Sequence, residues 1–236
     1  MPDAPRICDT HLDLFNFKHR LPHLAESLKR QRKIRIVAIG SSSTLGEGEV
    51  TPYPLRLQMA LRGRFHDLMI DVLNRGMSGQ EAPSELARFE PDVFAEAPAL
   101  VIWQIGTNAV FRNEQFNFED IANSIAAGLR WIGNMPMDVV LMDLQYATSV
   151  VEPKIKLEQS EDMVRRIAAA AAKANVNVFR RFDLMRHWVE QDHIPLQELV
   201  RQSDPLKLHM SEWATGCVSA ALFQSIKQVV EADGVT

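Results

Sequence analysis

Three serines and a threonine follow a short apolar run near the start of the chain. The stretch Gly40-Ser41-Ser42-Ser43-Thr44-Leu45-Gly46 comes directly after residues 34–39, which have strand length and are rich in isoleucine. A serine hydroxyl at the end of a strand is a candidate nucleophile, and hydroxyls beside glycine amides can also cradle a phosphate. Simple polar turns use the same residues. The stretch alone leaves these three interpretations open.

Two later loops carry groups that can stabilise negative charge. Asn74-Arg75-Gly76-Met77-Ser78-Gly79-Gln80 follows the second apolar run, and Gly106-Thr107-Asn108 follows the third. A glycine lets the backbone turn sharply and present its amide, and an asparagine side chain donates from its own amide. A serine, a glycine amide and an asparagine at three successive strand ends would form a nucleophile with an oxyanion hole.

A nucleophilic serine needs a base, and His209 is the best-placed histidine in the chain. It precedes the last helical stretch, in the loop Ser203-Asp204-Pro205-Leu206-Lys207-Leu208-His209-Met210-Ser211. An imidazole is the usual base near neutral pH because its unperturbed pKa is about 6.5. The other histidines lie before the first strand, at the start of the second, or in a helical or connecting segment: His11, His19, His23, His66, His187 and His193.

Metal and cofactor sites are not indicated by any motif. His19 and His23 have the spacing of two ligands on one helix turn, but Pro22 lies between them and no carboxylate cluster completes the set. The glycines after the first strand match neither a P-loop nor a dinucleotide fingerprint. We therefore expect no metal and no cofactor.

Five apolar runs alternate with helical patterns and would position these loops. The runs are residues 34–39, 67–73, 100–105, 139–144 and 176–179, and several are apolar on both faces. Between them lie helical spacings, with a further helix at 24–33 and a closing one at 212–232. This alternation predicts a doubly wound α/β/α sandwich, whose ligands bind at the carboxyl ends of the strands. We expect an irregular arm at residues 1–20 and a single domain at 21–236.

Composition narrows the class of protein. The chain has 236 residues, 46% of them hydrophobic, and a formal net charge of -4. This slightly acidic net charge does not indicate binding to nucleic acid or to an anionic membrane. No apolar stretch approaches the roughly 20 residues of a membrane span. Cys8 and Cys217 are too few for a disulfide framework and form no zinc motif. With no recognisable export signal, we expect a cytoplasmic protein with neither a nucleic-acid partner nor a membrane-inserted segment.

These loops, taken in their order along the chain, resemble the conserved blocks of the SGNH (GDSL-type) hydrolase superfamily. The resemblance is carried by Gly40-Ser41-Ser42-Ser43-Thr44-Leu45-Gly46, Asn74-Arg75-Gly76-Met77-Ser78-Gly79, Gly106-Thr107-Asn108 and Leu208-His209. It implies that Ser42 is the nucleophile, with Ser41 where the family usually has aspartate. The oxyanion hole would come from the Ser42 amide, the Gly79 amide and the Asn108 side chain. The implied fold is flavodoxin-like, with five parallel strands in the order 2-1-3-4-5.

The histidine block departs from the family pattern. The family's acid lies three residues before the histidine, where this chain has Leu206, and the nearest acid is Asp204, five residues before His209. Either Asp204 reaches the imidazole through a rearranged loop, or a backbone carbonyl orients the imidazole in a Ser-His dyad. Glu212 and Asp183 are more distant choices.

The resulting hypothesis is a serine hydrolase that cleaves carboxylic esters through an acyl-enzyme on Ser42, with His209 as general base. Its partner would be a small-molecule or carbohydrate ester. Two alternatives stay open: an acyltransferase or deacetylase acting on a carbohydrate, and a non-catalytic flavodoxin-like binding protein. Gln145 and Tyr146, which follow the fourth strand, are expected to face the cleft. The oligomeric state is not predicted.

Overall fold

A five-stranded parallel sheet forms the centre of the computed structural model, which describes residues 7–235. The strands lie in the order β2-β1-β3-β4-β5, and all four pairings are parallel. Their bounds are β1 (Lys33–Gly40), β2 (Met69–Gly76), β3 (Leu100–Gln104), β4 (Asp138–Met142) and β5 (Asn177–Phe179). This confirms the predicted fold class and strand order.

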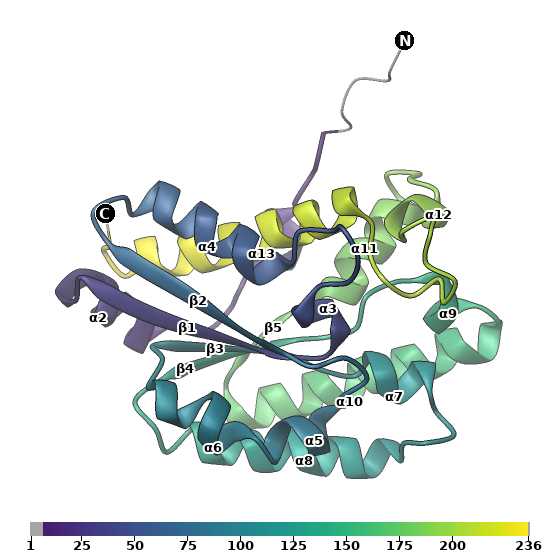
Figure 1. The fold of residues 1–236 in the computed structure, drawn as a ribbon, viewed down its shortest axis with the longest axis horizontal. Coiled ribbons are helices and arrows are strands. Elements are labelled where there is room, and N and C mark those ends of the chain that lie inside the picture. The colour runs from purple at the N-terminus through teal and green to yellow at the C-terminus, as the bar shows by residue number, and fades with distance from the viewer. Residues whose placement is uncertain (1–6, 236) are drawn as a thin grey trace.

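Helices cover both faces of the sheet (Figure 1). On one face α4 (Tyr53–Arg64) packs against α13 (Glu212–Ala232), and α13 also contacts α2 (Pro22–Arg30); α11 (Arg181–Glu190) lies on the same side. The other face carries α5 (Ala82–Leu86), α6 (Phe89–Asp92), α8 (Phe118–Ile132) and α10 (Lys154–Ala174). The short elements are α1 (Leu12–Phe15), α3 (Ser42–Leu45), η1 (Phe94–Glu96), α7 (Thr107–Phe111), α9 (Thr148–Val151) and α12 (Leu196–Leu199).

The core follows from strands that are apolar on both faces. Every residue of β3 and β4 is buried, as parallel strands between two helical layers require. The apolar positions of α8 recur at helical spacing and are buried against this sheet, and the helix begins where the Asn117 side chain accepts the amides of Glu119 and Asp120. The strand ends, and so the loops after them, are fixed by this core.

Element ends differ from the sequence expectations by a few residues. The second strand begins at Met69 rather than at residue 67, because a turn bonding the Leu68 amide to the Phe65 carbonyl precedes it. The helix expected at 24–33 ends at Arg30, since Lys33 already belongs to β1. The fourth strand ends at Met142, which leaves Asp143 and Leu144 in the loop at the sheet's carboxyl edge.

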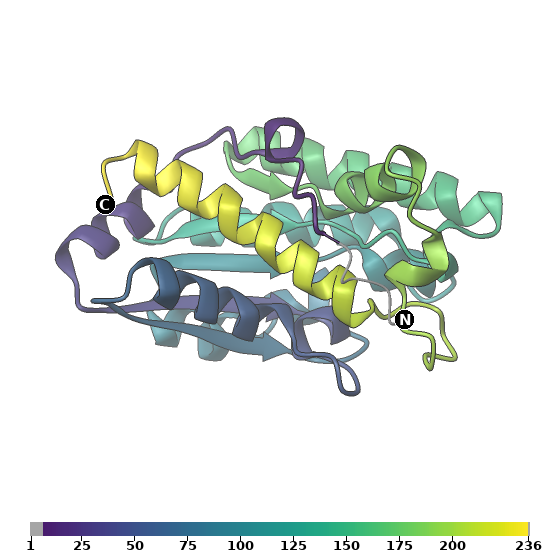
Figure 2. The same cartoon turned by 90° about the horizontal axis from the view of Figure 1, so that it is seen from above.

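The N-terminal arm packs on the domain rather than standing apart from it. Residues 12–15 form the one-turn helix α1, and Phe15 and Phe17 are buried. Cys8 forms a disulfide with Cys217 of α13, with their Cα atoms 5.6 Å apart. The sequence analysis did not anticipate this pairing, because 209 residues separate the two cysteines. Figure 2 shows the arm running beside α13. Residues 1–6 of the expected arm lie outside the described residues.

No helix within residues 7–235 combines the length and the apolar character needed to cross a membrane.

Candidate active site

Ser42 lies at the carboxyl end of β1, as the first residue of α3. The turn before it is held by Gln104, the last residue of β3, whose side-chain oxygen accepts the Ser41 amide and the Ser41 hydroxyl, each at 3.0 Å. The same oxygen accepts the Thr44 hydroxyl at 3.2 Å. Gln104 is fully buried, so the serine turn is fixed from below by a neutral group of the neighbouring strand.

The structure brings Ser42, His209 and Asp204 into one chain of contacts. The His209 Nε2 atom lies 3.2 Å from the Ser42 Oγ atom, and His209 Nδ1 lies 2.9 Å from an oxygen of Asp204. The sequence left open whether an acid or a backbone carbonyl orients the imidazole. In the structure Asp204 contacts the His209 ring, although the two residues are five positions apart in the chain. A base oriented by a carboxylate and facing a serine hydroxyl has the parts of a serine triad.

Asp204 is held as an anion by its own loop. It is 2% exposed, and burial by itself disfavours the charged carboxylate. Against that burial, its side chain accepts the backbone amides of His209 at 2.8 Å, Leu208 at 2.9 Å and Leu206 at 3.1 Å. These amides, together with the His209 charge, bring the pKa of Asp204 below its ordinary value. The carboxylate therefore stays ionised beside the imidazole at neutral pH.

The loop that carries Asp204 and His209 is closed at its base. Val200 and Met210 form an antiparallel bridge, and the Arg201 amide donates to the His209 carbonyl at 2.8 Å. Lys207 adopts a left-handed conformation with φ 49, which tightens the turn between the acid and the base. This compact turn explains how Asp204, five residues before the histidine, reaches the imidazole. In the resemblance described above, the acid stands three residues before the histidine.

Gln145 connects the loops of the site from below. Its side-chain oxygen accepts the Ser43 hydroxyl at 2.8 Å and the Thr107 hydroxyl at 3.2 Å, and its Nε2 donates to the Leu208 carbonyl at 3.2 Å. It is completely buried. The expectation that Gln145 faces the cleft is therefore wrong: it lies beneath the cleft and links the serine loop, the asparagine loop and the histidine loop. Tyr146 packs edge-to-face on Phe182.

The predicted oxyanion donors lie in the loops after β2 and β3. Gly79 has φ 78, a conformation that favours glycine, and an added Cβ would come within 3.3 Å of the Arg112 guanidinium. The Asn108 side chain donates to the Gln80 carbonyl at 2.8 Å, which ties the two loops together. An amide nitrogen carries two hydrogens, so a second one remains for an oxyanion.

Two buried glutamates support these loops, and the sequence analysis missed both. Glu81 accepts the Gly106 amide at 2.7 Å, the Ala109 amide at 3.0 Å and the Ala82 amide at 3.1 Å. Glu85, one helical turn on, accepts the indole N–H of Trp103 at 2.8 Å. Burial raises the pKa of both carboxyls, and the charge of Glu81 raises that of Glu85 further. Nothing in the sequence separates these glutamates from surface residues of a short helix.

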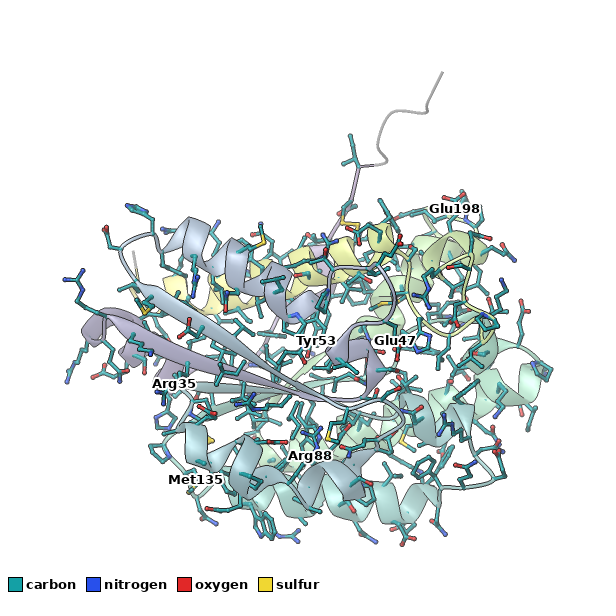
Figure 3. All side chains as sticks on the ribbon, viewed as in Figure 1. Arg35, Glu47, Tyr53, Arg88, Met135 and Glu198 are labelled. Atoms are coloured by element: carbon teal, nitrogen blue, oxygen red, sulfur yellow. A yellow bond between two sulfur atoms is a disulfide. The ribbon has the colours of Figure 1, made fainter. Side chains whose placement is uncertain are left out.

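A small pocket opens beside Ser42 and His209. Glu47, Val50 and Thr215 contribute to its lining. Figure 3 shows Glu47 next to the turn that follows α3. Its carboxylate lies 4.0 Å from His209 Nε2 and accepts the Ser78 hydroxyl at 3.1 Å. Glu47 was not singled out from the sequence, and it gives the mouth of this pocket a negative charge.

The other acids considered as partners of His209 form ion pairs elsewhere. Glu212 forms an ion pair with Arg56 and accepts the Thr51 amide, while Asp183 pairs with Arg180. Leu206, at the family's usual acid position, is 44% exposed and carries no charge. Asp204 is the acid in contact with His209 Nδ1.

Comparison with known proteins places the chain among lipase-like α/β proteins. The model of the non-GDSL lipase-like family matches residues 7–232, and the chain belongs to that family. No curated protein sequence matches the chain significantly.

Two solved structures share the fold at low sequence identity. The acetylxylan esterase Axe2 from Geobacillus stearothermophilus superposes with a TM-score of 0.71 at 19% identity, covering 82% of this chain and 94% of Axe2. A lipase/acylhydrolase from Enterococcus faecalis superposes with a TM-score of 0.67 at 21% identity, covering 83% of this chain and 96% of that protein. At this identity the likeness establishes the shared fold.

Proposed function

We propose that the protein is an SGNH-type serine hydrolase that cleaves carboxylic esters. The observation that carries the proposal is the contact chain from Ser42 through His209 to Asp204, with distances of 3.2 and 2.9 Å. Family membership supports it, as do the two similar folds, which belong to an esterase and an acylhydrolase. A binding protein without chemistry would have no use for an ionised, buried acid behind an imidazole that faces a serine.

The proposed reaction begins with proton transfer. His209 Nε2 takes the proton of the Ser42 hydroxyl as its oxygen attacks the ester carbonyl, and Asp204 stabilises the resulting imidazolium. The oxyanion of the tetrahedral intermediate accepts hydrogen bonds from the Ser42 amide, the Gly79 amide and the Asn108 side chain. The C–O bond then breaks, and the leaving alcohol receives the proton from His209. Water, deprotonated by the same base, releases the acid from Ser42.

A carbohydrate ester with a small acyl group is the substrate class that we favour. Axe2 is an acetylxylan esterase, and structures of its catalytic mutants alter a serine, an aspartate and a histidine. The pocket beside Ser42 is small, which suits a short acyl chain better than a fatty one. The Glu47 carboxylate at its mouth accepts hydrogen bonds and therefore suits a substrate rich in hydroxyl groups.

The test is labelling and turnover of the Ser42→Ala variant. The wild-type chain should react with a fluorophosphonate at Ser42 and hydrolyse p-nitrophenyl acetate, and Ser42→Ala should lose the label and at least about 10⁴-fold in kcat. Ser84→Ala, at an exposed serine of α5, is the matched control and should keep both. Full activity or full labelling of Ser42→Ala would refute the proposal. Product analysis with added sugars would show whether acyl transfer to an alcohol competes with hydrolysis.

A further inference from the structure

Two histidines and an aspartate meet on the arm side of α11, away from the serine site. His11 comes from the arm, His187 from the last turn of α11, and Asp192 from the loop after it. One potential ligand atom from each lies within 4.8 Å of the other two. His11 Nε2 is 2.7 Å from an oxygen of Asp192, and the rings of His11 and His187 are edge-to-face with centroids 4.4 Å apart. Esterase chemistry at Ser42 uses none of these groups.

The arm residue of this cluster is fixed in place before any ligand binds. The His11 amide donates to the Asp9 side chain at 2.9 Å, and the Trp188 indole donates to the Asp9 carbonyl at 2.8 Å. The disulfide from Cys8 to Cys217 anchors the arm three residues earlier. His11 itself has φ 43, a left-handed conformation that a non-glycine residue adopts only when its surroundings impose it. The imidazole is therefore presented toward α11 by several independent contacts.

We propose that His11, His187 and Asp192 bind one divalent transition-metal ion, of which zinc is the best representative. Two imidazole nitrogens and one carboxylate oxygen are a donor set that zinc accepts, with water completing the coordination. Binding replaces the hydrogen bond between His11 and Asp192 by two bonds to the metal, so that His11 Nε2 carries no hydrogen and the N–H of the neutral ring is at Nδ1. No metal site was expected from the sequence, where the one pair at ligand spacing, His19 and His23, is interrupted by Pro22. His11, His187 and Asp192 are too far apart in the chain to form a motif.

A further carboxylate lies behind the His11 ring. Asp9 has an oxygen 3.7 Å from His11 Nδ1, on the opposite side of the ring from the nitrogen that faces Asp192. Imidazoles that bind metals usually donate their other N–H to a carboxylate or carbonyl, which fixes the tautomer and strengthens the ligand. The 3.7 Å separation is longer than a hydrogen bond, and a small rotation of the Asp9 side chain would bring its oxygen within reach of Nδ1.

The three side chains need only a modest movement to reach metal-binding geometry. Ligand atoms at about 2.0–2.1 Å from a tetrahedral metal are about 3.3 Å apart, so the widest separation in the cluster must shorten by about 1.5 Å. Asp192 is the most accessible member and lies after the helix, where a side-chain rotation changes no core packing. The ion would join the arm to α11 across more than 170 residues of chain. Because the unfolded chain has no such site, binding stabilises the folded state.

The test is zinc titration of the untagged protein by calorimetry, in buffer without reductant so that the disulfide cysteines supply no thiolate. We expect one zinc ion per chain with a dissociation constant in the micromolar range, and a rise in Tm of about 5–10 °C at a zinc concentration near 100 times that constant. His187→Ala and Asp192→Asn should each weaken binding at least about tenfold. The asparagine can still accept a hydrogen bond from His11, so this variant separates metal ligation from hydrogen bonding.

The matched control is His66→Ala. His66 also has an aspartate neighbour, Asp67, with N and O atoms 3.7 Å apart, but the cluster of three ligands does not include it. This variant should bind zinc as the wild type does. The proposal fails if the wild type shows no saturable zinc binding, if His187→Ala and Asp192→Asn bind as tightly as the wild type, or if His66→Ala removes the binding. Absence of fluorophosphonate labelling of the wild-type chain at Ser42 would refute the proposed esterase but would leave the zinc result unaffected.

Discussion

The two sides of the candidate active site are each built on a buried carboxyl group, and the pKa values of the two groups are shifted in opposite directions. On the histidine side, Asp204 accepts three backbone amides and faces the His209 ring, and its pKa lies below the ordinary value. On the asparagine side, Glu81 also accepts three backbone amides, yet its pKa is raised. Similar numbers of hydrogen bonds therefore accompany pKa shifts in opposite directions.

The difference lies in what else surrounds each carboxyl group. Burial opposes ionisation in both places and is the largest influence on each pKa. At Glu81 burial outweighs the backbone amides, and a second carboxyl, Glu85, lies one helical turn away, whereas at Asp204 the loop amides together with the His209 imidazole outweigh burial. We infer that Asp204 acts through charge on the imidazole, while Glu81 acts mainly by holding the Gly106 and Ala109 amides in position.

Replacing Asp204 tests the charged side and should give the largest effect of a single substitution outside the nucleophile and base. Asp204→Asn keeps the shape of the side chain but removes the charge that stabilises the imidazolium, so kcat should fall by about 10³–10⁴. Steady-state hydrolysis of p-nitrophenyl acetate measures this. A Ser-His dyad, in which a backbone carbonyl orients His209, predicts a loss below about tenfold, and that result would remove Asp204 from the mechanism.

Replacing Asn108 tests the oxyanion donor on the other side. Asn108→Ala should lower kcat by about 100- to 1,000-fold while KM changes little, because the lost hydrogen bond forms with the charge that develops in the transition state. The side chain also donates to the Gln80 carbonyl, so unfolding by urea should accompany the kinetics. If the activity loss merely tracked a loss of folded protein, Asn108 would be a structural link between the two loops and no oxyanion donor.

Replacing Glu81 separates position from charge. Glu81→Gln keeps one good acceptor but puts an NH₂ group opposite a backbone N–H, at either Gly106 or Ala109. We expect about a tenfold loss in kcat and a destabilisation of about 1–3 kcal/mol, measured by urea unfolding. An effect as large as that of Asp204→Asn, with a shifted pH profile of kcat, would show instead that Glu81 acts through its charge.

The sequence predicted the sheet and the place of His209 at its rim for physical reasons, and the family resemblance selected Ser42 among the neighbouring serines. Neither kind of reasoning extends to the residues that support the site. Strands buried on both faces are continuous apolar runs, and the carboxyl ends of parallel strands meet at one edge, so the loops of the site could be assigned in advance. The contact of Asp204 with His209 depends on a left-handed residue at Lys207 and a bridge from Val200 to Met210, which residue types do not reveal. Glu81 and Gln145 support the loops from buried positions, and burial is known only once the chain is packed.

A third buried carboxyl, Asp143, extends the comparison to stability. Burial raises its pKa to about 7, because the amide of Phe182 and the guanidinium of Arg181 only partly compensate. The folded state therefore holds a proton that the unfolded chain, with a pKa near 3.8, has released. Stability must rise as pH falls through 7, by about 1 kcal/mol between pH 8 and pH 6. Asp143→Asn, which can still accept the Phe182 amide, should lose this component.

The measurement is the difference in unfolding free energy between wild type and Asp143→Asn, from urea titrations at pH 8 and pH 6. Taking the difference removes the pH-dependent contributions that the two proteins share. The variant should be relatively more stable at pH 8 than at pH 6. An equal difference at both values would mean that Asp143 is ionised throughout, as Asp204 is, and that the charge of Arg181 outweighs burial there as His209 and the loop amides do at the active site.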